Sequence, residues 1–110
     1  EGPAATVEPE LVRILREFRA AGKPIGAVCI APAVLVRALG EGEVTIGNDP
    51  GTAGAIVAMG GTHHLCGVEE LCVDSARRIV TAPAYMYDDA RISEVAIGIE
   101  RAVAATLALA

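Results

Sequence analysis

The sequence predicts a single α/β domain in which helices cover a mainly parallel sheet. Short apolar runs bounded by turn residues alternate with segments whose apolar residues recur at helical spacing. The 110 residues suffice for one domain, 1–110, and are too few for two. Hydrophobic residues reach 53% but aromatic residues only 3%, so the apolar content is mostly aliphatic, which is typical of strands buried on both faces.

The first third of the chain predicts a helix, a strand and a second helix. "EPE" supplies a proline and acidic residues suited to a first helical turn, and apolar residues follow at helical spacing, so we expect a helix over 8–21. "PIGAVC" is a short apolar run between turn residues, which predicts a buried strand over 25–29. "APAVLVRALG" has a proline in its first turn and a glycine after its last, which predicts a helix over about 31–40.

The middle of the chain predicts shorter elements. "EVTIG" indicates a strand over 43–47, "NDPG" a turn, and "TAGAIVAMG" a helix over 52–60 that ends at a glycine pair. "THHLC" indicates a further short strand over 62–66.

A hairpin and a long helix complete the predicted domain. "ELCVD" and "RIVTA" alternate around the polar link "SAR", which is typical of a β-hairpin over 70–82. Apolar residues then fall on one face of a helix predicted over 88–109, namely Ile92, Val95, Ala96, Ile99 and Val103.

Charge and hydropathy exclude several classes of partner. The formal net charge is −5 and basic residues do not cluster, so we expect neither a nucleic-acid partner nor an anionic membrane surface. The apolar C-terminal run is interrupted by Glu94, Glu100 and Arg101, which argues against a membrane span there.

The cysteines indicate a reducing environment. Cys29, Cys66 and Cys72 form no CxxC pair and are odd in number, which favours free thiols. The first residues also lack the basic start and apolar core of a secretory signal. We therefore expect a cytoplasmic protein.

Cys29 lies where the predicted strand passes into the predicted helix. A nucleophile on such a sharp turn needs small residues two positions before and two after it, and Ala27 and Ala31 meet that need. The N-terminal N–H groups of the helix would favour a thiolate and hold an oxyanion. The alternative is that Cys29 is a small buried hydrophobic residue, because free cysteine is among the most buried residue types.

His63, His64 and Cys66 form a candidate metal site, since histidine and cysteine are the usual zinc ligands. On a strand, however, His64 and Cys66 share one face and His63 points to the other, so only two ligands converge. A structural zinc ion wants four ligands, and we therefore predict no metal.

Three stretches of the chain resemble a known family. "AAGKPIGAVCIAPAVL", "VTIGNDPGTAGAIVAMG" and "CVDSARRIVTAPAYM" are similar to successive blocks of the ThiJ/PfpI superfamily, which includes the Parkinsonism-associated deglycase and shares its fold with class I glutamine amidotransferases. Within it, "CIAPA" and "TAPAYM" resemble the ElbB-type branch, also called sigma cross-reacting protein and described as glyoxalase-like.

The resemblance implies a flavodoxin-like three-layer sandwich with Cys29 as the catalytic nucleophile on its elbow. It implies a cofactor-independent reaction in which the thiolate adds to a 2-oxoaldehyde such as methylglyoxal and a hydroxy acid is released. Ile30 then lies next to the oxyanion site, where the PfpI branch has a histidine. Asn48 and Asp49 stand where the deglycase branch ends a strand in histidine, and Tyr85 belongs to the "TAPAYM" motif; we expect these three to lie near the substrate.

Two expected blocks of the family have no counterpart in the sequence. These are the strand and loop that carry a glutamate bonded to the nucleophilic sulfur, and the glycine-rich loop that follows. The resemblance therefore implies that the chain corresponds to the C-terminal half of an ElbB-type protein, and that it lacks activity alone. The high apolar content agrees, because it predicts a surface covered by the missing N-terminal half or by a second copy in a homo-oligomer such as a dimer.

Two functions stay open on the sequence. One is a glyoxalase-like enzyme acting on small aldehydes through Cys29. The other is a non-catalytic module of the same fold that senses oxidants or binds small molecules, because the neighbouring histidine and the glutamate are missing.

Overall fold

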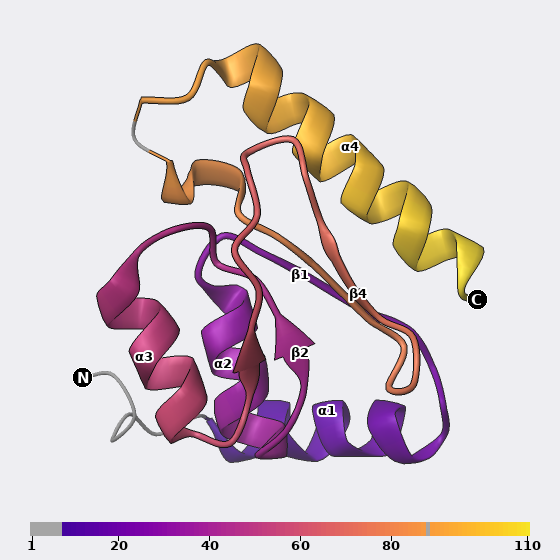
Figure 1. Cartoon of the computed structure of the whole chain (residues 1–110). Coiled ribbons are helices and arrows are strands. Elements are labelled where there is room, and N and C mark those ends of the chain that lie inside the picture. Colours follow the sequence, from indigo (N-terminus) through magenta and orange to yellow (C-terminus); the bar gives the residue numbers. More distant parts are fainter. Residues whose placement is uncertain (1–7, 88) are drawn as a thin grey trace.

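The computed structural model describes residues 8–87 and 89–110. Its helices and strands alternate along the chain as far as β3, after which β4 and β5 follow without an intervening helix (Figure 1). In order they are α1 (Pro9–Ala20), β1 (Ile25–Val28), α2 (Ala31–Leu39), β2 (Glu43–Val44), α3 (Pro50–Ala58), β3 (Thr62–His63), β4 (Cys72–Asp74), β5 (Ile79–Ala82), the 3-10 turn η2 (Ala84–Met86) and α4 (Ile92–Ala108).

The strands form two small sheets. In the first, with order β1-β5-β4, β1 runs parallel to β5 and β4 runs antiparallel to it. In the second, β2 pairs with β3 in parallel. The predicted hairpin and the predicted parallel pairing are both present.

Side chains bridge the two sheets. The N–H of Glu43 donates to Asp74 Oδ2 at 2.9 Å, and the N–H of Thr45 donates to Thr81 Oγ1 at 3.0 Å. The strand predicted over 43–47 therefore shortens to Glu43–Val44, because beyond it the backbone bonds to a side chain instead of a strand ladder.

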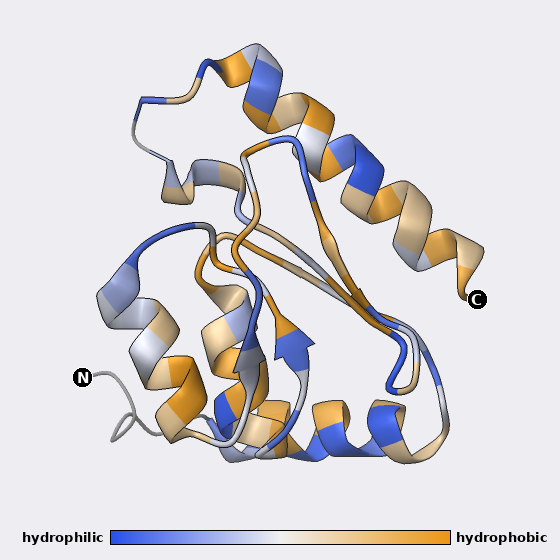
Figure 2. Ribbon diagram, in the orientation of Figure 1, coloured by the Kyte–Doolittle hydropathy of each residue, from blue (hydrophilic) through white to orange (hydrophobic). Residues whose placement is uncertain are grey.

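Helices cover both faces of the first sheet, with α4 on one side and α2 and α3 on the other (Figure 1). β5 is buried on both faces: Ile79 joins a cluster with Leu35, Val36 and Ile56, whereas Val80 and Ala82 pack with Ala102 of α4. Figure 2 shows the hydrophobic strands beside the hydrophilic turn that links β4 to β5. The predicted three-layer α/β architecture is confirmed.

Two helix starts differ from the prediction. α3 begins at Pro50 and not at 52, because the Asp49 side chain accepts from the N–H of Thr52 and caps the helix there. α4 begins at Ile92, where Glu94 bonds back to the N–H of Arg91 in a capping box. Residue 88, the predicted start, lies outside the described residues.

The strand predicted over 62–66 is also shorter than expected and comprises Thr62–His63 only.

Within the part of the chain that the structure describes, no helix combines the length and the hydropathy that crossing a membrane requires.

Candidate active site

Cys29 directly follows β1 and has the backbone of a strained turn. Its φ is +62°, in the left-handed region that residues other than glycine rarely adopt. Its N–H donates to the carbonyl oxygen of Ala82 at 3.0 Å, which ties the turn to the end of β5. α2 begins two residues later, at Ala31, so the chain passes from strand to helix through two residues, the half-buried Cys29 and the N-cap residue Ile30. This strand–turn–helix geometry is that of a nucleophile elbow.

The N-terminus of α2 adjoins the elbow. Ile30 is its N-cap residue and makes no side-chain cap, and its carbonyl oxygen accepts from the N–H of Ala33 at 3.0 Å. The first N–H groups of a helix have no partner within the helix and carry its positive dipole end. Ile30 is 49% exposed, and the group that it can contribute to the site is its backbone N–H.

The segment after β5 lies next to the elbow. β1 and β5 are parallel with Val28 opposite Ala82, so Cys29 and Pro83 leave the sheet at neighbouring positions. Ala84 then takes a positive φ of +49°, and the turn η2 follows. Tyr85 lies on this turn with 62% of its surface exposed. The two motifs "CIAPA" and "TAPAYM", far apart in sequence, thus meet at one end of the sheet.

A third loop completes this end of the sheet. Gly47 has a φ of +94°, and a Cβ placed on it would lie 2.9 Å from Cε2 of Tyr87 and 3.3 Å from Cβ of Pro83. The Tyr87 hydroxyl donates to the carbonyl oxygen of Cys66, and burial raises the pKa of Tyr87, which keeps this donor protonated. Asn48, which is exposed, follows Gly47 directly. The loops after β2, β3 and β5 are thereby held together.

Comparison with known proteins identifies the family. No family model matches the chain. It is 40% identical over 99 residues to the human glutamine amidotransferase-like class 1 domain-containing protein 3, mitochondrial, covering 82% of this chain and 37% of that protein. It is 39% identical over 95 residues to the rat ES1 protein homolog, mitochondrial, covering 78% of this chain and 36% of that one.

A solved structure agrees in fold. The crystal structure of an isoprenoid biosynthesis protein with amidotransferase-like domain from Ehrlichia chaffeensis matches with a TM-score of 0.87 and 37% identity, over 94% of this chain and 49% of that one. The chain belongs to the ThiJ/PfpI, class I glutamine amidotransferase-like superfamily. The predicted family and its flavodoxin-like fold are therefore confirmed, and the chain spans about half of the solved relative and a little over a third of the curated ones.

Cys29 is the one cysteine of this superfamily member that is not buried. Cys66 and Cys72 are both in the interior, and all three thiols are free. Burial raises the pKa of Cys72 to about 11, and its thiol donates to the carbonyl oxygen of Glu43 at 3.5 Å. Cys72 is therefore an inert core residue, and Cys29 is the thiol that a ligand can reach.

Asp49 caps α3, a structural role that was not predicted from the sequence. Its Oδ2 accepts from the N–H of Thr52 at 3.0 Å and from Thr52 Oγ1 at 2.5 Å. These bonds hold the pKa of Asp49 below its usual range. A contact of Asp49 with substrate stays a prediction, and it would have to coexist with this helix cap.

The histidines do not form a metal centre with Cys66. His63 Nε2 accepts from the N–H of Ile46 at 3.3 Å, and burial with the neighbouring His64 lowers the pKa of His63. His64 Nε2 lies 3.0 Å from Glu43 Oε1 on the surface. Over residues 8–87 and 89–110, no three His, Cys, Asp or Glu side chains converge as metal ligands.

The Cys29 sulfur makes no hydrogen bond to an acid or base within the described residues. Neither a carboxylate nor an imidazole of residues 8–87 and 89–110 bonds to its sulfur. The elbow thus supplies a thiol and backbone donors.

Sequence reasoning missed two residues that hold the loops around the site, Tyr87 and Gly47. The scarcity of aromatic residues in the sequence was the only signal that pointed to Tyr87.

Proposed function

We propose that Cys29 is the nucleophile of a glyoxalase-like reaction on 2-oxoaldehydes such as methylglyoxal. The observation that supports this most is the +62° φ of Cys29 at the turn between β1 and α2, because strained backbone of this kind clusters at functional sites. The relatives in the amidotransferase-like superfamily support the fold on which such an elbow occurs.

The chemistry follows from what the elbow offers. The Cys29 sulfur adds to the aldehyde carbon, and the carbonyl oxygen becomes the oxyanion of a hemithioacetal. N–H groups at the start of α2, beginning with Ile30, are the donors for that oxyanion. Through an enediol, one proton then moves from the former aldehyde carbon to the adjacent carbon and the hydroxyl proton passes to the ketone oxygen, which converts the hemithioacetal to the thioester of a 2-hydroxy acid. Water hydrolyses the thioester to the 2-hydroxy acid and regenerates the thiol, so no external oxidant or reductant is needed.

The proton transfer requires an acid or base, and no carboxylate or imidazole of the described residues hydrogen-bonds to the sulfur. We therefore expect the 110-residue chain alone to form the hemithioacetal but not to release lactate. We expect turnover only when a polypeptide also supplies this acid or base.

The test measures adduct formation on the chain itself. Isotope-labelled methylglyoxal followed by NMR should give a hemithioacetal carbon signal in the parent chain and in Cys66→Ser, and none in Cys29→Ser. An equal signal in Cys29→Ser would refute the assignment of the nucleophile. A lactate assay on the same samples separates binding from turnover.

A second function needs no acid or base bonded to the Cys29 sulfur. Cys29 is the half-buried thiol, and its exposure favours reversible oxidation to a sulfenic acid in a sensor or small-molecule-binding module, which needs no proton transfer between substrate carbons. Peptide mass spectrometry after mild peroxide treatment should then find Cys29 oxidised and Cys66 and Cys72 reduced, with no lactate formed under any condition. Oxidation of a buried cysteine before Cys29 would rule this function out.

The free thiols also bear on location. Cys29, Cys66 and Cys72 are unpaired, which suits a reducing compartment, and we propose the cytoplasm. The human and rat relatives carry the word mitochondrial in their names, so fractionation of cells that produce this protein is the measurement that decides.

A further inference from the structure

His63 is a half-buried histidine to which the proposed reaction assigns no role. It is the last residue of β3, and its Nε2 lies 3.3 Å from the backbone nitrogen of Ile46. An amide N–H can only donate, so Nε2 is the acceptor and the neutral ring carries its proton on Nδ1. Ile46 is fully buried, and the ring therefore fixes the backbone of the loop that follows β2.

This hydrogen bond leads from β3 to the Cys29 elbow in two steps. Gly47 follows Ile46, and a Cβ on Gly47 would lie 3.3 Å from Cβ of Pro83, so the loop after β2 packs directly on Pro83. Pro83 follows Ala82, whose carbonyl oxygen accepts from the N–H of Cys29 at 3.0 Å. The position of the loop therefore bears on the backbone of the elbow.

Protonation of His63 is incompatible with the bond from Ile46. The charged ring carries a hydrogen on both nitrogens and has no acceptor, so its Nε2–H would face the N–H of Ile46. A buried polar group that loses its partner costs free energy. The ring can avoid this cost only by turning away, or the loop by moving. The bond thus exists only while the ring is neutral.

The elements around His63 bring few titratable groups. α3 packs against β3 and carries none over Pro50–Ala58. Within the described residues, the other surrounding segments bring Glu43 from β2, His64 and Cys66 from the chain after β3, Asp49 from the start of α3, and Tyr87 from the segment after η2. Of the two carboxylates, Glu43 pairs with His64 and Asp49 caps α3.

These surroundings keep His63 neutral in ordinary conditions. Burial and the neighbouring His64 lower the pKa of His63, and hydrogen bonding with the Gly47 backbone raises it by less. The ring is therefore neutral at pH 7 and becomes charged in solution more acidic than the ordinary histidine pKa of about 6.5.

We propose that His63 is a positioning residue of the Cys29 site. Its neutral ring holds the loop that begins at Ile46 against Pro83 and keeps the exposed Asn48 at the carboxyl end of the sheet, and protonation releases this loop. The proposal rests on the proposed function of Cys29, because it concerns how the same site is regulated. It makes ligand binding at the elbow dependent on pH in mildly acidic solution.

An NMR titration of the 110-residue chain measures this coupling without any ligand. The ring signals of His63 report its protonation, and the amide signals of Ile46, Asn48 and Cys29 should shift with the same midpoint. Corrected for the intrinsic pH dependence of exchange, the hydrogen-exchange protection of the Ile46 amide should fall at least about tenfold across that midpoint. Amide signals of Asn48 and Cys29 that do not follow the His63 ring would overturn the proposal.

Substitutions at His63 separate the hydrogen bond from the titration. His63→Gln offers an amide oxygen at about the place of Nε2 and does not titrate, so the Ile46 amide should stay protected at every pH. His63→Leu has no acceptor, so that amide should lose its protection at every pH. Should His63→Leu not fold, His63→Gln and the parent chain still decide.

His64→Gln is the matched control. The His63 titration should persist in it with its midpoint at higher pH, because the neighbouring charge that disfavours protonation is gone. An amide step at Ile46 that survives in His63→Gln, or that disappears in His64→Gln, would contradict the proposal.

Methylglyoxal binding gives a second readout. Addition of a thiol to an aldehyde neither takes up nor releases a proton, so this equilibrium brings no pH dependence of its own in acidic solution. The dissociation constant of the Cys29 adduct should rise at least about threefold below the His63 midpoint, because fewer molecules have the loop in place, and should stay constant in His63→Gln. A constant value in both would overturn the proposal. Absence of adduct from the parent chain at every pH would refute the proposed function instead, and the amide titration would then decide the role of His63.

Discussion

At the scale of single residues, the backbone of Cys29 is the feature that distinguishes a functional cysteine from a core cysteine. A left-handed conformation costs a residue with a Cβ roughly 1 kcal/mol or more, whereas glycine adopts it freely. Cys29 occupies this conformation at φ +62°, between a buried strand and a helix. The strain aims a side chain at the end of the sheet where the loops gather.

This strain can be measured by comparing two substitutions that both remove the sulfur. Cys29→Gly should be more stable than Cys29→Ala by about 1 kcal/mol in urea unfolding, because only alanine keeps the Cβ that the conformation disfavours. At an ordinary half-buried position alanine would be the more stable of the two. That ordering at Cys29 would show that the elbow is not strained.

Gly47 gives a second residue-level prediction. Gly47→Ala should destabilise the chain by about 2 kcal/mol, because the φ of +94° disfavours a Cβ and the new methyl group would meet the Tyr87 ring at 2.9 Å. Gly54→Ala in α3 is the control: no atom lies within 4 Å of its Cβ position, and helix propensity favours alanine. Equal losses of stability in both variants would mean that the Gly47–Tyr87 contact does not hold the loops.

At the scale of elements, charged side chains fasten the β4–β5 hairpin to the rest of the chain. Asp74 is buried and accepts from the N–H of Glu43 and from Arg77, and Glu41 accepts from Arg77 and from Arg19 of α1. Burial alone would raise the pKa of Asp74, but the bonds from Glu43 and Arg77 lower it overall. The bond from Arg77 likewise lowers the pKa of Glu41.

These shifts predict acid sensitivity. A carboxylate whose pKa is lower in the folded state stabilises the fold above its unfolded pKa, about 4, and this contribution is lost as the pH falls through the folded value. Asp74→Asn should therefore be less stable than the parent chain at neutral pH, and the difference should shrink below about pH 4. Glu100→Gln, on the exposed face of α4, is the control. A difference independent of pH would contradict this account; urea unfolding across pH measures it.

Elements with strong local signals were predictable, and those completed by distant side chains were not. α1, β1 and α2 lie within a residue or so of their predicted ranges, because prolines, glycines and apolar spacing mark them locally. The strands predicted over 43–47 and 62–66 shorten where Thr45 bonds to Thr81 and where His63 accepts from Ile46. No local pattern encodes those bonds, nor the contact of Gly47 with Tyr87.

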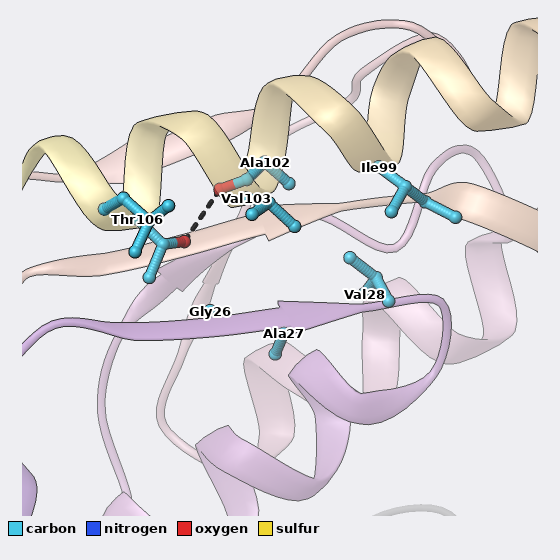
Figure 3. A pocket seen from close by; sticks show the side chains of 8 residues that line it. Gly26, Ala27, Val28, Ile99, Ala102, Val103 and Thr106 are labelled. Atoms are coloured by element: carbon cyan, nitrogen blue, oxygen red, sulfur yellow. Dashed lines mark hydrogen bonds between the residues drawn. The ribbon is translucent and has the colours of Figure 1, made fainter.

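At the scale of the whole molecule, the layered fold explains why the elbow is where it is. β1 and β5 are parallel, so their carboxyl ends and the loops that follow meet at one end of the sheet, where open α/β folds bind ligands. The other edge of β1 has no strand partner among the described residues, and it adjoins the apolar groove between β1 and α4 (Figure 3). Cys29 thus lies next to this open edge of the sheet.

The most direct test of the central claim is the alkylation of the three thiols at neutral pH, followed peptide by peptide with and without methylglyoxal. We predict that Cys29 is alkylated well before Cys66 and Cys72, and that methylglyoxal protects Cys29 alone, because the aldehyde and the alkylating agent compete for one sulfur. Alkylation of Cys66 or Cys72 at the rate of Cys29, or a Cys29 rate unchanged by methylglyoxal, would contradict it.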